Sequence, residues 1–112
     1  GIKVSEEKYH SNAGKYQELE GPPIAETLLK SLGYPEPFIG RVCWLVGHHH
    51  TYDDIQDIDH QILVEADFLV NAYEDSLSVS SICNVLSGIF RTVSGKHLLQ
   101  IIYLNPSIKC QE

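Results

Sequence analysis

Three consecutive histidines, His48, His49 and His50, follow an apolar helical stripe and suit metal or phosphate chemistry best. Imidazole binds divalent transition metals and exchanges protons at physiological pH. On a helix, His49 comes seven residues after Val42 and three after Val46, so it projects from the side of the stripe. Consecutive residues point in different directions, so at most two of the three share a site. The alternative is a polar helix end, where imidazoles favour the helix dipole.

A carboxylate, Asp67, lies among apolar residues spaced three and four apart, which predicts that it is partly buried. Burying a carboxylate is costly unless it is paired, hydrogen-bonded or bound to a metal. Two interpretations stay open, a salt bridge to Arg41 or Arg91 and a role as metal ligand. Its neighbours Glu65 and Asn71 are expected on the solvent side or supporting a ligand.

Two further polar segments are interpreted structurally. Residues 14–23 place a lysine and two carboxylates between glycines, and we favour a surface loop over a ligand site. Residues 90–96 resemble a turn between helices, with Thr92 or Ser94 as N-cap, rather than an anion contact made by their two cations.

Composition narrows the function classes. The chain has 112 residues, 43% of them apolar, which suits one soluble domain with a modest core. Fifteen acidic and eight basic residues give a net charge of −7, so binding to a nucleic acid polymer through a broad basic face is not expected. No apolar run approaches a membrane span, and the first 20 residues lack the apolar region of a signal peptide.

The cysteines indicate a compartment. Cys43, Cys83 and Cys110 are odd in number and form no Cys-x-x-Cys pair. Cys43 and Cys83 lie among apolar residues and are interpreted as small buried hydrophobic side chains. Free thiols favour a reducing compartment, so we predict a cytoplasmic protein.

The elements that must position these residues are all helical. We predict one domain over residues 1–112, with an irregular lead-in loop at 1–20 and helices over 21–112. The last segment also suits a buried strand, but no partner strand is evident. We predict five helices. The first begins at Gly21–Pro23 and ends near Gly33, the second covers 38–46, and the third covers 58–74. The fourth follows Ser76–Ser78 as far as Phe90, and the fifth covers 94–104 and ends before Asn105-Pro106.

His49 at the end of one predicted helix is followed 18 residues later by Asp67, after Ala66, on the next helix. This order resembles the second half of an HD-domain metal-dependent phosphohydrolase. That superfamily is all-α and builds its metal site from an early His, a His-Asp doublet and a late Asp. The resemblance to one bacterial branch covers most of the chain, through residues 14–25, 47–52, 62–71 and 90–97.

The resemblance implies a fold, a cofactor and a substrate class. The fold is an HD-like helical bundle without its N-terminal helices. Asp67 matches the late metal-ligand Asp, and His49 matches a His that supplies a further ligand or a substrate contact. The implied cofactor is a divalent metal ion (Mn, Fe, Ni, Zn or Mg), and the substrate is a nucleotide or another phosphate ester. Substrate contacts are expected from His50, Lys15 and Glu18.

The chain departs from the family pattern in two places. Two-metal members have a His where Gln17 stands, which favours one metal or the use of Glu18 instead. Neither His10 nor His60 is followed by Asp, so the His-Asp doublet is missing. The opening Gly1-Ile2-Lys3 resembles the continuation of a His-Asp-Ile-Gly segment, and the chain contains no Met. We therefore expect a piece of a longer enzyme that is inactive alone.

A second hypothesis is a non-catalytic helical module for interaction or oligomerisation. A bundle without its upstream helices leaves apolar faces uncovered, which favours association, including homo-oligomers.

Overall fold

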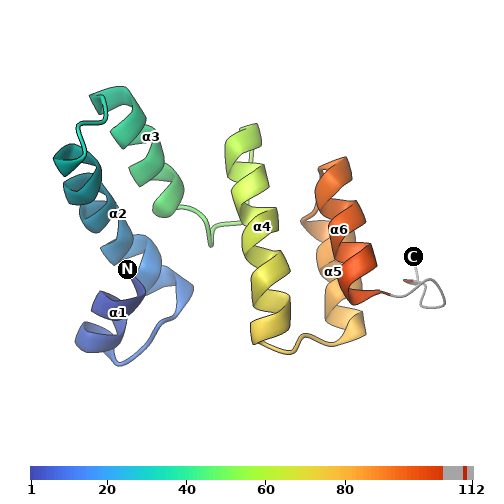
Figure 1. Cartoon of the computed structure of the whole chain (residues 1–112). Coiled ribbons are helices and arrows are strands. Elements are labelled where there is room, and N and C mark those ends of the chain that lie inside the picture. The colour runs from blue at the N-terminus through green and yellow to red at the C-terminus, as the bar shows by residue number, and fades with distance from the viewer. Residues whose placement is uncertain (105–109, 111–112) are drawn as a thin grey trace. The chain divides into compact units, whose positions relative to one another are not determined.

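The computed structural model describes residues 1–104 and 110, and folds them into six α-helices without a strand (Figure 1). The predicted all-α class is confirmed, with six helices in the described part rather than five. The chain divides into two compact units, Gly1–Thr51 and Tyr52–Glu112. The single HD-like bundle stays a prediction. No helix within the described residues is both long enough and apolar enough to cross a membrane.

The first unit contains α1 (Ile2–Tyr9), α2 (Gly14–Ser31) and α3 (Glu36–Val46), and α2 packs against both neighbours. The prediction of an irregular lead-in over 1–20 is wrong, because α1 and the start of α2 occupy it. Contacts between these helices explain the error. The ring of Tyr9 stacks on Tyr16 at 4.2 Å, and its hydroxyl donates to Glu20 at 2.7 Å. Lys8 pairs with the same carboxylate at 3.1 Å.

The predicted start of α2 is also wrong. Gly21–Pro23 predicts a first turn, yet the helix begins at Gly14 and runs through Pro22 and Pro23. The two prolines lack the N–H groups that would bond to carbonyls one turn earlier, so the helix continues with two fewer internal hydrogen bonds. The predicted end is confirmed nearby, since Gly33 adopts a left-handed backbone with φ of 80°.

The second unit contains α4 (Ile58–Glu74), α5 (Val79–Gly88) and α6 (Val93–Tyr103), and α6 packs against both of the others. The three predicted helices are confirmed, the last as a helix rather than a strand. Thr92 is the N-cap of α6, as predicted, and accepts from the Gly95 N–H at 3.0 Å. The predicted stop at Asn105-Pro106 lies outside the described residues. The core consists of Ile82, Phe90, Leu99 and Leu104.

The apolar stripe of α4 faces outward more than expected. Ile58 is 66% exposed and Ile62 is 55% exposed. The buried side of the helix instead carries Val64 beside the polar side chains of Gln61 and Glu65. Of the two alternatives for Glu65, the solvent-side position is wrong, because this residue is only 2% exposed.

The cysteines also differ from expectation. Cys83 is half-buried and forms a disulfide with Cys110, so its interpretation as a free hydrophobic side chain is wrong. The Cα atoms lie 5.4 Å apart, within the usual range for a disulfide, although 27 positions separate the residues in sequence. Cys43 is free and half-buried. Cysteine content therefore no longer supports a reducing compartment.

Candidate functional site

The three histidines form the turn that ends α3. The His48 N–H donates to Leu45 and the Thr51 N–H donates to His48, which closes the turn with backbone bonds. The His48 ring stacks on Trp44 at 4.1 Å, and its Nδ1 contacts the Trp44 carbonyl at 2.6 Å. His48 therefore packs back along the helix, as the polar-end interpretation predicts.

His49 has the geometry of a potential ligand. Its Nδ1 lies 2.7 Å from the Val46 carbonyl, which only accepts hydrogen bonds, so Nδ1 carries the proton. In the neutral ring, the lone pair is then on Nε2. Metal-bound histidines commonly use this arrangement, because a backbone carbonyl fixes the tautomer and the ring orientation. The His49 and His50 ring centroids are 3.9 Å apart.

His50 joins the turn to the start of α2. Its Nε2 lies 3.2 Å from the amide oxygen of Gln17, and its backbone N–H donates to Glu18 at 3.3 Å. The same Glu18 oxygen accepts from the Thr51 hydroxyl at 2.7 Å. Gly14 makes this approach possible, because a Cβ there would lie 2.8 Å from Cγ of His50. We call Gln17, Glu18, His49, His50 and Thr51 the histidine turn cluster.

Lys15 and Glu18 differ in their placement. Lys15 is exposed, and its ammonium lies 4.8 Å above the ring of Tyr16 as a cation–π contact. Glu18 is half-buried and accepts from the backbone and hydroxyl of the histidine turn cluster, so it positions that turn.

Asp67 belongs to the second unit, on α4. It is half-buried, as expected, and Oδ2 accepts from the Asn71 amide one turn later at 2.9 Å. A side-chain amide on one oxygen orients the carboxylate, as supporting residues do around metal ligands. Over residues 1–104 and 110, no three His, Cys, Asp or Glu side chains gather in a way that would hold a metal ion.

A second buried carboxylate was missed by the sequence analysis. Glu65 accepts from Gln61 Nε2 at 2.6 Å, from the Arg91 and Thr92 N–H groups at 3.1 Å each, and from the Thr92 hydroxyl at 2.6 Å. Burial raises the pKa of Glu65, but these hydrogen bonds together lower it below its ordinary value. The four-residue spacing from Gln61 was the available signal. Because Arg91 and Thr92 lead into α6, their hydrogen bonds to Glu65 join α4 to the start of α6.

Two cavities lie in the second unit. A polar cavity of about 360 Å³ is lined by Tyr52, Asp54, Ile55, Gln61, Gly88, Ile89 and Arg91. The guanidinium of Arg91 donates to the carbonyls of Gly88 and Phe90, where it caps the end of α5. An apolar groove of about 420 Å³ runs between α4 and α6, with Ile58, Ile62, Leu69 and Leu98 among its walls.

Comparison with models of protein families, with curated proteins and with solved structures finds no match to this chain.

Proposed function

We propose that this chain is the C-terminal part of a cytoplasmic HD-type metal-dependent phosphohydrolase that acts on a nucleotide or another phosphate ester. The main support is the sequence resemblance, which runs through most of the chain. The histidine turn cluster adds to it. By the resemblance, two-metal members have a ligand His where Gln17 stands, and Glu18 could serve instead; the side chains of Gln17 and Glu18 contact the ring and backbone of His50. Among the structural observations, that contact between sequence-distant residues supports the proposal most directly.

Each residue then has a distinct role. The resemblance gives a role in metal binding to each of two residues: Asp67, whose carboxylate accepts from Asn71, and His49, whose Nδ1 lies against the Val46 carbonyl. Such a metal, when bound, polarises a phosphate ester and lowers the pKa of a bound water. His50 and Lys15 would contact phosphate oxygens, and Glu18 would keep the histidine turn in place. The missing His-Asp doublet would come from residues upstream of this chain.

The test uses the natural protein that contains this chain with its upstream sequence. We expect a His-Asp pair upstream and Mn²⁺-dependent hydrolysis of p-nitrophenyl phosphate and nucleoside monophosphates. Replacing Asp67 by Ala should lower this activity and bound metal by more than about 100-fold. Asp75→Ala, at the exposed end of the same helix, is the matched control and should change neither. An upstream sequence without His-Asp, or activity that survives Asp67→Ala, would refute the proposal.

A second candidate function is a helical interaction module. The observation that favours it is the apolar groove between α4 and α6, because Ile62 and Leu98 in its walls are exposed. Association would bury this surface and stabilise the complex. In sedimentation experiments, we expect a homo-oligomer that dissociates in Ile62→Glu, whereas Lys96→Glu on the same unit leaves it intact. A monomer at all concentrations would contradict self-association.

A further inference from the structure

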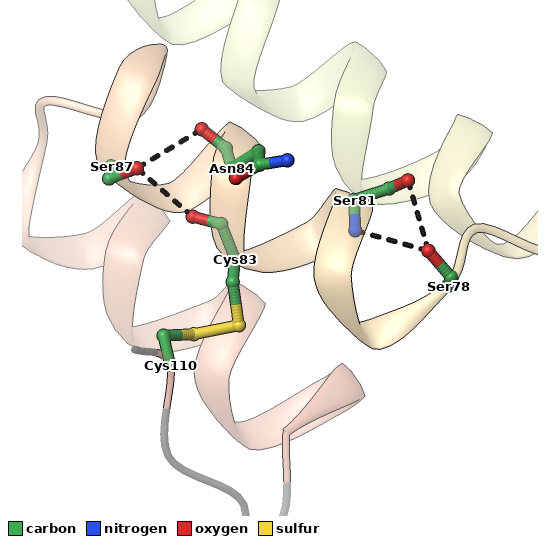
Figure 2. The surroundings of a disulfide bond; sticks show 6 residues. All are labelled: Ser78, Ser81, Cys83, Asn84, Ser87 and Cys110. Atoms are coloured by element: carbon green, nitrogen blue, oxygen red, sulfur yellow. Dashed lines mark hydrogen bonds between the residues drawn. A yellow bond between two sulfur atoms is a disulfide. The ribbon is translucent and has the colours of Figure 1, made fainter. Parts of the chain in front are cut away.

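The disulfide between Cys83 and Cys110 joins α5 to a residue that lies beyond the end of α6 (Figure 2). Cys110 packs against the core of the second unit, formed by Ile82, Phe90, Leu99 and Leu104. The bond therefore holds a late part of the chain on the apolar centre of this unit. No role in phosphate chemistry accounts for it.

Both cysteines pack against the core of the second unit but are not fully buried. Cys83 and Cys110 are each half-buried rather than enclosed. On α5, the Ser87 hydroxyl donates to the Cys83 carbonyl at 3.2 Å (Figure 2). Thiol–disulfide exchange requires that an attacking thiolate reach one sulfur, and the partial exposure of both residues favours exchange over a fully enclosed disulfide.

The rest of the unit does not depend on this bond alone. Phe90 and Leu99 are almost completely buried, and Glu65 ties α4 to the start of α6 through three hydrogen bonds. We therefore expect the three helices to persist when the disulfide opens. The structural change would be local to Cys110 and the core surface that it covers.

We propose that Cys83 and Cys110 form a redox switch, closed as a disulfide and open as two thiols. In the opening step, the thiolate of a small cellular thiol attacks one sulfur, the S–S bond breaks, and the departing sulfur takes a proton. A second thiol then resolves the mixed disulfide. Overall, one disulfide and two small thiols give two cysteine thiols and one oxidised small-thiol dimer. Opening releases Cys110 from α5 and uncovers apolar core surface.

The proposed location gives one more argument. Cytoplasmic disulfides in most organisms are transient and act in catalysis or redox sensing. This argument rests on the cytoplasmic location in the proposed function, whereas the exchange measured below depends on neither location nor phosphatase activity.

The experiment counts accessible thiols in the folded chain by alkylation and mass spectrometry. After incubation in air-saturated buffer without any small thiol or disulfide, we expect one alkylated cysteine, Cys43. After millimolar reduced glutathione without denaturant, we expect three alkylated cysteines, increased fluorescence of an apolar dye and unchanged helical circular dichroism. Cys43→Ser is the control and should keep the switch, with no alkylated cysteine when closed and two when open.

The variants Cys83→Ser and Cys110→Ser should bind the dye without glutathione and respond to neither treatment. Where a variant fails to fold, reduction of the unmodified chain decides. Three alkylated cysteines under the oxidising condition would overturn the proposal, because no pair forms. A disulfide that resists reduced glutathione in the folded chain, or opening with no change in dye fluorescence, would also overturn it.

Discussion

Replacing Glu65 by Gln tests the carboxylate that joins α4 to α6. In the protein, Oε2 accepts from Gln61 and from the Arg91 and Thr92 N–H groups, and Oε1 accepts from the Thr92 hydroxyl. A hydrogen bond to a charged group contributes about 1.5–3 kcal/mol, against about 0.5–1.5 kcal/mol for a neutral pair. The neutral amide costs less to bury, which offsets part of the loss. We expect Glu65→Gln to lower the free energy of unfolding by about 1–2 kcal/mol.

Replacement by alanine removes the acceptor completely. In Glu65→Ala, the side chain of Gln61 and the N–H groups of Arg91 and Thr92 lose their carboxylate partner. Leaving a buried donor without an acceptor costs about 1–3 kcal/mol for each group. Because a domain is stable by roughly 5–15 kcal/mol, this variant should unfold the second unit much more readily.

The pH dependence has a definite sign. Because the pKa of Glu65 is below its ordinary value of 4.5 in the folded chain, the carboxylate stabilises the fold above pH 4.5. This contribution is lost as the pH falls through the lowered folded-state pKa. The stability difference between the natural chain and Glu65→Gln should therefore be constant above pH 4.5 and shrink below it.

The assay is urea unfolding followed by far-UV circular dichroism, combined with hydrogen exchange at two amides. The N–H groups of Arg91 and Thr92 donate to Glu65, so they should exchange faster in Glu65→Gln. Glu74→Gln, an exposed change at the end of α4, is the matched control and should stay within about 0.5 kcal/mol. Equal unfolding midpoints for the two variants, or unchanged exchange at these amides, would refute the reasoning.

Two further predictions concern helix packing and capping, each with thermal unfolding as the measurement. Gly95→Ala should destabilise the fold by about 1–3 kcal/mol, because the added Cβ would lie 1.8 Å from Oε1 of Glu65. Gly40→Ala, with open space around it, should instead stabilise α3 by up to about 1 kcal/mol, and equal signs would contradict the packing argument. Ser78→Ala should cost about 1 kcal/mol by removing the N-cap of α5. Ser80→Ala, inside the same helix, should change stability by less than half of that.

Helices with a long apolar period were predicted well. The stripe over 58–74 gave both ends of α4 as the structure has them, because side-chain periodicity acts within one element. Thr92 and Gly33 were predicted as caps for the same reason, since capping depends on neighbouring residues. The second cap carries a positive φ that favours glycine.

Elements stabilised by distant residues were missed. The stacking of Tyr9 on Tyr16 stabilises α1, a helix that no apolar periodicity in the sequence predicts. Burial of Glu65 depends on donors 26 and 27 positions away, at Arg91 and Thr92. The sequence indicates that a glutamate follows Gln61 by one turn, but it does not reveal which side of α4 meets α6.

In the candidate site too, features that depend on neighbouring residues were predicted, and contacts between distant residues were not. The histidine turn was predicted from its place after an apolar stripe, and the partial burial of Asp67 was predicted from its apolar neighbours. The contact between Glu18 and residues 50 and 51 joins two helices, so spacing alone did not predict it. The metal and the substrate stay predictions.

The carboxylate that meets the start of α6 also has a kinetic consequence. Beginning a helix is unfavourable, because several residues must be ordered before the first hydrogen bond forms. The residues that enter α6 give their N–H groups to Glu65, which belongs to α4. The backbone that leads into α6 is therefore held by a helix that precedes it in the chain. Growth of α6 should follow the arrival of α4, so its formation rate reports tertiary assembly rather than local helix propensity.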